Sequence, residues 1–225
     1  MFSKQKIHEI EQKLGVVYKN KTLLELAFTH SSYGNINEVE NNERLEFLGD
    51  SVLHFATTQY LFNNFNMSEG VLSKVRSYVV SAKNLVKAVD ELDLIIYLQY
   101  GKNETKNTST AIKANLFEAI LASIYLDKGF EAAYQFVIKK LHYTKKMFES
   151  LIDNTCDYKT TLQELIQTKR ENVLEYKLIK KDGPPHAPIF TVHVLLNKKV
   201  MGKGQGNSKK EAENIAAQYA IKKLM

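Results

Sequence analysis

The amino-acid sequence predicts an α+β protein, in which an all-helical domain is followed by a small αβββα domain. Apolar residues recur with helical spacing through residues 1–148, whereas strand-like runs and strong turn signals appear after residue 151. A chain of 225 residues can form one large domain or two small ones. We expect two, comprising residues 1–150 and residues 151–225.

In the first region, several segments place apolar residues on one face of a helix. These segments are residues 7–14, 23–28, 44–62, 71–80, 85–92, 114–126 and 131–141. Turn-forming residues separate them at positions 34–35, 63–66 and 101–110. The pattern is typical of an all-helical domain.

The second region begins with a polar stretch, residues 150–157, which we expect to be a connector. Asp157 is suited to cap a helix over residues 158–167. Three strands separated by turn signals are expected next, over residues 174–180, 189–196 and 199–206. A closing helix over residues 209–224 carries on one face Ala212, Ile215, Ala216, Tyr219, Ala220 and Leu224.

Charge is distributed unevenly along the chain. The formal net charge is +6, and the last 75 residues carry +5 of it. This asymmetry suits a near-neutral body joined to a basic module that meets a polyanion. A basic surface without a nucleic-acid partner would account for it equally well.

Composition excludes several classes of protein. A single cysteine, Cys156, rules out an intramolecular disulfide framework and a multi-cysteine zinc site. No apolar run approaches the roughly 18 residues that span a bilayer, and the N-terminal segment lacks the apolar core of a secretory signal. We therefore expect a cytoplasmic protein with no membrane partner.

Acidic residues gather on one face of residues 43–51. At roughly 100° per residue, Glu43, Glu46 and Asp50 fall within about 60° of one another on a helix. The apolar residues cluster on the opposite side: Leu45, Leu48, Val52 and Phe55. Like charges at this spacing repel, and a hard divalent cation such as Mg²⁺ would offset the repulsion by binding their oxygens. A solvated acidic face is the alternative.

A further carboxylate lies within a nearly all-apolar helix, residues 114–126. This residue is Glu118, and Asn115 lies one turn earlier on the same side. A buried carboxylate is unfavourable unless it is paired or bound to a metal ion. Pairing with a basic residue, for instance Arg44, Lys74 or Arg76, is the alternative to a metal site. Two acid-bearing helices in one domain favour the metal site.

Phe47 is unusually placed for an aromatic residue. It lies roughly 70° from the centre of the acidic face and away from the side that carries Leu45 and Leu48. Such a ring either fills a local gap or anchors a partner subunit.

These motifs together resemble bacterial ribonuclease III, a double-stranded-RNA-specific endoribonuclease. Residues 42–51 (NERLEFLGDS) resemble the signature stretch of that family, residues 69–74 its second acidic and polar patch, and residues 114–127 the helix that brings further metal ligands. Residues 157–164, 183–190 and 202–217 resemble its double-stranded-RNA-binding domain. The resemblance covers nearly the whole chain, with the motifs in the family's order.

The resemblance implies a homodimeric hydrolase that cuts both strands of duplex RNA. Its products would carry 5′-phosphate and 3′-hydroxyl ends with two-nucleotide 3′ overhangs, and its substrates would be ribosomal RNA precursors and structured messenger RNA. By motif position, Glu46, Asp50 and Glu118 would hold Mg²⁺, with Mn²⁺ as a substitute, and Glu43 would lie at the rim near the RNA. Phe47 matches the family's aromatic knob, which inserts into the other subunit.

Asn115 departs from the family pattern, which has an Asp as its fourth acidic ligand. An amide oxygen still binds Mg²⁺ or orients a metal-bound water, but one negative charge is lost. We expect retained activity with weaker metal affinity. The alternative is a non-catalytic or weakly catalytic regulator that binds duplex RNA.

The αβββα module suits duplex RNA, which is contacted through minor-groove 2′-hydroxyls and phosphates over roughly 16 base pairs. The residues expected to bind RNA are Thr160, Gln163 and Glu164 on the first helix, His186 in the loop, and Ser208, Lys209 and Lys210 at the start of the last helix. The helix dipole and the two lysine charges would together bind the phosphates between the two minor grooves.

Overall fold

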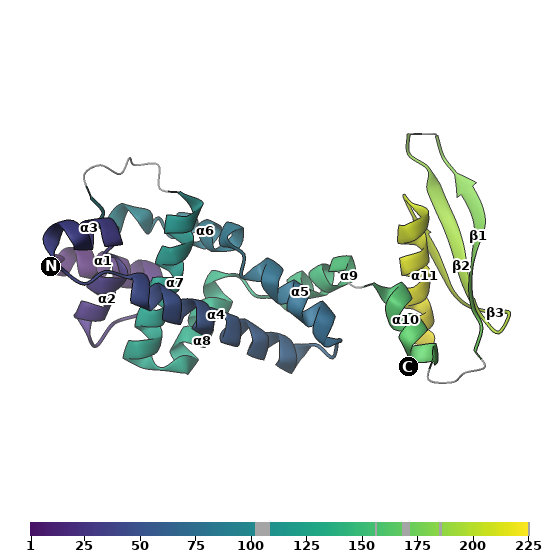
Figure 1. The fold of residues 1–225 in the computed structure, drawn as a ribbon, viewed down its shortest axis with the longest axis horizontal. Helices are drawn as coiled ribbons and strands as arrows, with labels where there is room; N and C mark the ends of the chain where they lie inside the picture. The colour runs from purple at the N-terminus through teal and green to yellow at the C-terminus, as the bar shows by residue number, and fades with distance from the viewer. Residues whose placement is uncertain (102–108, 156, 168–171, 185, 225) are drawn as a thin grey trace. The chain divides into compact units, whose positions relative to one another are not determined.

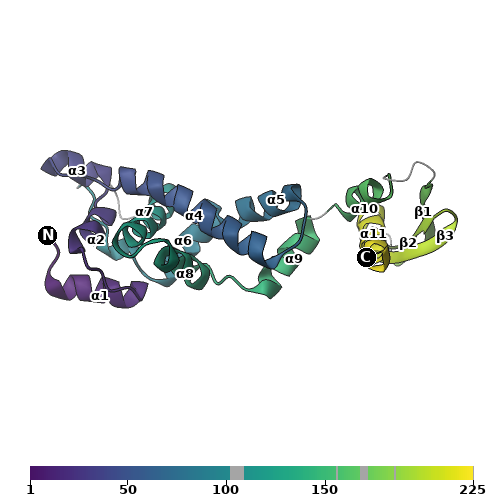
Figure 2. The ribbon, with the colours of Figure 1, turned by 90° about the horizontal axis from the view of Figure 1, so that it is seen from below.

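The computed structural model describes residues 1–101, 109–155, 157–167, 172–184 and 186–224. The chain divides into two compact units, Met1–Thr155 and Cys156–Met225 (Figures 1 and 2). Within the described ranges, no helix is both long enough and apolar enough to cross a membrane.

The first unit is helical, as expected. Its elements are α1 (Lys4–Leu14), α2 (Lys21–Ala27), α3 (Ser31–Asn37), α4 (Glu43–Asn64), α5 (Glu69–Val79), α6 (Ala82–Glu91), the 3₁₀ turn η1 (Ile95–Tyr97), α7 (Thr110–Lys128), α8 (Phe130–Lys140) and α9 (Lys145–Thr155). Helix α7 forms the centre of the core because its apolar residues cover nearly its whole circumference, including the fully buried Leu116, Phe117 and Ile120. It packs against α2, α4, α6 and α8 (Figure 1).

Two predictions for this unit are wrong. The turn expected at residues 34–35 lies inside α3, which His30 caps by accepting a hydrogen bond from the backbone N–H of Ser32 at 3.2 Å. The connector expected over residues 150–157 is helical as far as Thr155, as part of α9. That helix is held by burial, since Phe148 is fully enclosed and its ring packs against those of Tyr60 and Tyr143.

Phe55 is also misplaced by the helical pattern, which puts it among the core residues of α4. It is 58% exposed, and its ring lies 4.9 Å from that of Phe130 at the start of α8. The apolar face of α4 is therefore wider than the part of the helix that packs against the core.

The second unit has the expected αβββα order: α10 (Tyr158–Gln167), β1 (Leu174–Asp182), β2 (Ile189–Leu196), β3 (Lys199–Gly206) and α11 (Lys209–Leu224). The sheet is antiparallel with strand order β1-β2-β3, and α11 packs on one face of it (Figure 1). Asp157 caps α10 by accepting a hydrogen bond from the N–H of Thr160 at 3.3 Å.

Helix α11 approaches β3 closely because Gly202 and Gly204 have no side chain. A Cβ at Gly202 would overlap the backbone oxygen of Ala216, and a Cβ at Gly204 would overlap that of Ala212. The buried face of α11 consists of Ala212, Glu213, Ala216, Ala217 and Ala220. Tyr219, which the helical pattern groups with the buried alanines, is instead 57% exposed. A glycine-lined strand admits only small side chains, which explains the alanine-rich face.

Candidate active site

Helix α4 carries the acidic face on its first turns. Asn42 precedes it with its own side chain buried and donating to the carbonyl oxygen of Ala27 at 3.2 Å, so the start of the helix is anchored to α2. Glu43 and Asp50 are exposed and Glu46 is half-buried, as an acidic stripe at the edge of a core-facing helix should be.

Gly49 brings Glu118 to this stripe, a role that the sequence motifs did not reveal. A Cβ at Gly49 would overlap the backbone carbonyl of Glu118, so α4 and α7 touch at this point with no side chain between them. Gly49 is therefore the contact that sets Glu118 beside Glu46 and Asp50.

We predict that Gly49→Ala destabilises the protein by about 2–3 kcal/mol and lowers activity, because the new methyl group forces α7 away from α4. Gly70→Ala is the matched control, since a Cβ there meets nothing within 4 Å. Its expected effect on the free energy of unfolding is less than about 1 kcal/mol. Urea denaturation of the two variants tests this prediction, and equal stabilities would contradict it.

The carboxylates of the two helices act on one another. Burial raises the pKa of Glu118 to about 7, and the neighbouring Asp50 and Glu46 add to the shift. The pKa of Glu46 is also raised, by burial and by Glu43, and is partly restored by a hydrogen bond from Asn115 and by the charge of His30. Glu46, Asp50, Asn115 and Glu118, all named from sequence, thus form one interacting cluster.

The alternative interpretation of Glu118, an ion pair with a basic residue, does not match this arrangement. Within the described part of the chain, no Lys or Arg forms an ion pair with Glu118, and the charged groups that add to the effect of burial on its pKa are both acidic. Arg76, one of the suggested partners, instead donates to the hydroxyl of Thr58 at 2.9 Å. Among the described residues, no Lys or Arg neutralises the cluster, whose only basic neighbours are the imidazoles of His54 beside Asp50 and His30 near Glu46.

The raised pKa of Glu118 has a consequence for stability. A carboxyl whose folded pKa lies above its unfolded value favours folding at low pH, and this contribution is lost as the pH rises through about 7. In metal-free buffer, the unfolding free energy of Glu118→Gln relative to that of the parent should therefore increase by about 1–2 kcal/mol from pH 5 to pH 8. This is less than the full linkage value because the Glu118 side chain is only half-buried. Urea denaturation at both pH values measures this. Glu131→Gln, at an exposed site, should show no such change, and a pH-independent difference for Glu118→Gln would refute the expectation.

The donor set fits a hard divalent cation, because it consists of three carboxylates and one amide oxygen on two facing helices. Among the residues that the structure describes, no three His, Cys, Asp or Glu side chains converge closely enough to enclose an ion. Asp50 Oδ1 lies 3.5 Å from Nε2 of His54, and Glu46 accepts a hydrogen bond from Asn115. The cluster therefore offers a cation oxygen donors and negative charge, but its side chains are not already arranged around an ion.

His30 is a second residue whose relation to the site the motifs did not indicate. Its ring caps α3, and its charge lowers the pKa of Glu46. Nothing in the spacing of residues 28–32 indicates this proximity, which depends on how the segment before α3 folds against α4.

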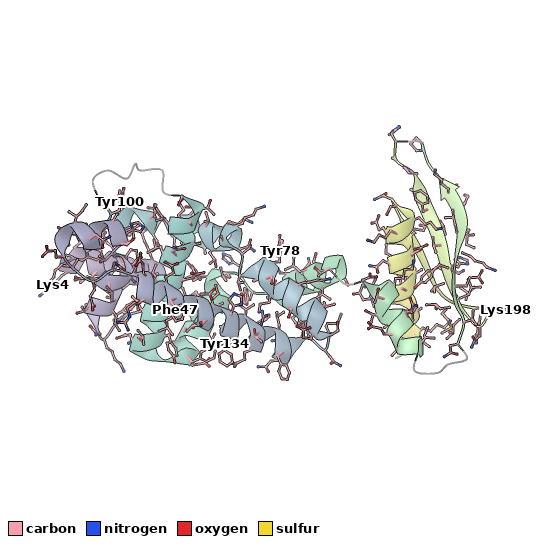
Figure 3. All side chains as sticks on the ribbon, in the orientation of Figure 1. Lys4, Phe47, Tyr78, Tyr100, Tyr134 and Lys198 are labelled. Carbon is pink, nitrogen blue, oxygen red and sulfur yellow. The ribbon has the colours of Figure 1, made fainter. Side chains whose placement is uncertain are left out.

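Phe47 is 81% exposed at the N-terminal part of α4 (Figure 3). It borders a groove of about 880 Å³ that has an apolar part and a polar edge. The apolar part is lined by Leu23, Leu26, Leu45, Leu48 and Leu126, and the polar edge by Glu40, Asn41, Glu43 and Arg44. The ring does not fill a local gap, so the first of the two interpretations of Phe47 fails. An exposed ring beside an apolar groove is a self-complementary feature, suited to pairing two copies about a twofold axis.

In the second unit, the residues named for RNA binding are all exposed. Thr160, Gln163 and Glu164 lie on α10, and the Thr160 hydroxyl donates to Asp157 at 3.1 Å. His186 lies between β1 and β2. Figure 1 shows the end of β1, the start of β2 and the N-terminal end of α11 at one end of the unit, with α10 beside the C-terminal half of α11.

The start of α11 combines a cap with cationic charge. The Ser208 hydroxyl accepts a hydrogen bond from the N–H of Glu211 at 3.1 Å, and Lys209 and Lys210 follow it with exposed side chains. Lys209 lies 3.9 Å from Glu213, which Lys159 of α10 contacts more closely at 2.7 Å. Glu213 thus ties α10 to α11, the two helices that carry most of the residues named for RNA binding.

Comparison with known proteins agrees with both units. Residues 20–144 match the family model described as ribonuclease-III-like, and residues 158–224 match the double-stranded RNA binding motif. Ribonuclease 3 of Clostridium botulinum (strain Eklund 17B / Type B) is 43% identical over 99% of this chain and 97% of that protein. Ribonuclease 3 of Listeria monocytogenes (strain EGD-e) is 40% identical over 96% of this chain and 97% of that protein.

A solved structure supports the fold of the first unit. The nuclease domain of ribonuclease III from Campylobacter jejuni is 36% identical, with a TM-score of 0.57, over 60% of this chain and 96% of that one. The Clostridium and Listeria relatives align with nearly the full sequence, and each unit matches the model of the corresponding domain. The chain therefore belongs to the bacterial ribonuclease III family of double-stranded-RNA endoribonucleases.

Proposed function

We propose that this chain is a Mg²⁺-dependent endoribonuclease that hydrolyses both strands of double-stranded RNA, leaving 5′-phosphate and 3′-hydroxyl ends with two-nucleotide 3′ overhangs. It acts in the cytoplasm on ribosomal RNA precursors and structured messenger RNA, with Mn²⁺ as a substitute metal. The first unit cuts and dimerises, and the second binds duplex RNA. The observation that carries the proposal is the cluster of Glu46, Asp50 and Glu118, which has no Lys or Arg ion-pair partner among the described residues, in a chain of this family.

In this proposal, Glu46, Asp50, Asn115 and Glu118 hold the ion, and Asp50 and Glu118 are the catalytic carboxylates. An Mg²⁺ ion held by these residues would supply an activated water, positive charge for the phosphoryl oxygens and stabilisation of the leaving 3′-oxygen. Glu118 must give up the proton that its pKa of about 7 lets it hold near neutral pH. Asn115 orients Glu46 through their hydrogen bond, and Glu43 lies exposed at the rim toward the RNA.

Asn115→Asp should bind Mg²⁺ roughly tenfold more tightly than the parent, because a fourth negative charge joins the donor set. The same change removes the hydrogen bond that Asn115 gives to Glu46. Titration calorimetry with Mg²⁺ at pH 8 measures the affinity, with Asn84→Asp, outside the cluster, as the control. Equal affinities of parent and Asn115→Asp would count against Asn115 as a ligand.

The homodimer in this proposal pairs the Phe47 ring of each copy with the apolar groove of the other. The groove contributes leucines from α2, α4 and α7, and its volume of about 880 Å³ accommodates a phenyl ring. Because the contact is repeated by symmetry, each copy contributes one Phe47 ring and the interface contains two such anchors.

The second unit supplies affinity for duplex RNA with little sequence preference. Thr160, Gln163 and Glu164 contact one minor groove and His186 the next, while Ser208, Lys209 and Lys210 bind the phosphates between them. The exposure of all seven residues supports these roles.

The experiment that tests the function is incubation of an end-labelled RNA duplex, about two binding-module footprints long, with the full chain. Mg²⁺-dependent shortening, with product ends that carry 5′-phosphate and two-nucleotide overhangs, is expected. A shift in RNA mobility without shortening would identify the regulator instead, and efficient cutting of a DNA duplex would indicate a different nuclease.

A further inference from the structure

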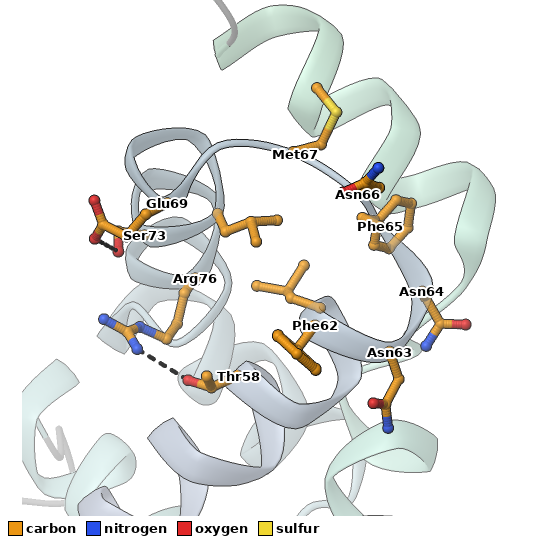
Figure 4. A pocket seen from close by; sticks show the side chains of 12 residues that line it. Thr58, Phe62, Asn63, Asn64, Phe65, Asn66, Met67, Glu69, Ser73 and Arg76 are labelled. Carbon is orange, nitrogen blue, oxygen red and sulfur yellow. Dashed lines mark hydrogen bonds between the residues drawn. The ribbon is translucent and has the colours of Figure 1, made fainter.

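A cavity between the C-terminal part of α4 and helix α5 has no role in the proposed reaction. Its volume is about 700 Å³, within the range of small-molecule binding sites. Its lining includes Thr58, Phe62, Phe65, Met67, Leu72 and Arg76, none of which belongs to the acidic cluster (Figure 4).

Arg76 provides an unneutralised cation at this cavity. One guanidinium nitrogen, Nη1, donates to the Thr58 hydroxyl at 2.9 Å, and that hydroxyl donates to the carbonyl of His54 at 2.7 Å. The Nε of Arg76 is buried without a hydrogen-bond partner, and no described carboxylate forms an ion pair with Arg76. A guanidinium fixed in this way has donors left for a planar or tetrahedral anion.

The acid nearest in sequence does not fill that role. Glu69 lines the same cavity, but its carboxylate accepts a hydrogen bond from the Ser73 hydroxyl at 2.7 Å (Figure 4). Glu69 and Arg76 form no ion pair in the described structure, so the guanidinium is open to an anion from outside the chain.

Aromatic and amide groups line the same cavity as this cation. Phe62 is 78% exposed, and Figure 4 shows it lining the cavity together with Arg76, Asn63 and Asn64. The Asn64 amide nitrogen donates to the carbonyl oxygen of Tyr60 at 2.8 Å, which leaves its oxygen to accept a hydrogen bond. An exposed ring is a stacking surface for a nucleobase, side-chain amides hydrogen-bond base edges, and Arg binds phosphate.

We propose that this cavity binds one unpaired nucleotide of RNA, with its base stacked on Phe62 and its phosphate bound by Arg76. The inference rests on the proposed function, because the nucleotide belongs to the RNA that the protein engages. Such a site would let a bulge or an unpaired end set where the enzyme sits on a duplex, which contacts to the duplex backbone alone do not determine.

The test compares two RNAs in metal-free buffer: a fully paired duplex and the same duplex with one unpaired nucleotide. We expect the parent to bind the second about tenfold more tightly, and Phe62→Ala and Arg76→Gln to lose that preference while binding the paired duplex normally. Tyr78→Ala, an exposed aromatic of α5 outside the cavity, should keep it. Equal binding of both RNAs by the parent overturns the inference and leaves the proposed function standing, whereas failure to bind either RNA sinks both.

A second measurement separates a nucleotide site from a plain anion site. Adenosine monophosphate added to the ¹⁵N-labelled full chain should shift amide resonances of residues 62–76 in the parent and not in Phe62→Ala. Inorganic phosphate should produce a much smaller shift. The same shifts with phosphate alone would show that the base contributes nothing, and would overturn the inference.

Discussion

Glu118→Gln should abolish RNA cutting while leaving RNA binding unchanged. The substitution keeps the size of the side chain and removes the charge that Asp50 and Glu46 oppose in the parent. Loss of residues that merely orient metal ligands costs about 10–100-fold, so loss of a ligand should reduce cleavage at least about 100-fold. Cleavage rate and duplex affinity, measured on the same preparation, test the prediction.

The control for this variant is Glu131→Gln, which makes the same chemical change at an exposed position of α8. It should cut at the parental rate. If Glu118→Gln also cut within a few-fold of the parent, Glu118 would not be a metal ligand. If it lost RNA binding together with cutting, the effect would be on the fold and not on the reaction.

Phe47→Ala should convert the proposed homodimer to monomers. A hot-spot aromatic ring contributes about 2 kcal/mol or more, and the twofold axis uses it twice, so the dissociation constant should rise roughly 10³-fold. Because the ring is 81% exposed in the single chain, its removal should leave the unfolding free energy of the monomer nearly unchanged. Sedimentation velocity over a range of concentrations measures the shift.

Phe62→Ala serves as the matched control for the dimer. Phe62 lies on the same helix and is 78% exposed, yet it borders the α4–α5 cavity and not the groove beside Phe47. It should leave the dimer intact. Equal sedimentation of parent and Phe47→Ala would remove Phe47 from the interface.

Much of the candidate site follows from sequence because helical spacing relates residues on one element. The spacing predicts that Glu43, Glu46 and Asp50 share a face and that Asn115 and Glu118 share another, as the structure has them. Contact between these two faces depends on Gly49, whose role appears only when α7 is placed against α4. A periodic pattern contains no information about which element covers a given face.

The same limit explains the errors in the fold. Phe55 and Tyr219 follow the helical period of their buried neighbours but remain exposed, since the surfaces against which α4 and α11 pack are narrower than the apolar arcs. Helix α3 contains Gly34 and Asn35, which are typical of turns, and its cap at His30 outweighs that local preference. Tertiary contacts and caps decide these cases.

Titration calorimetry of Mg²⁺ into the parent and into Glu118→Gln, at pH 7 in buffers of different ionisation enthalpy, tests the central claim most directly. The parent should bind Mg²⁺ with release of about half a proton, because Glu118 has a pKa of about 7 and must ionise to coordinate the ion. Glu118→Gln should bind far more weakly and without proton release. Equal affinity and equal proton release in the two proteins would contradict a metal site built on Glu118.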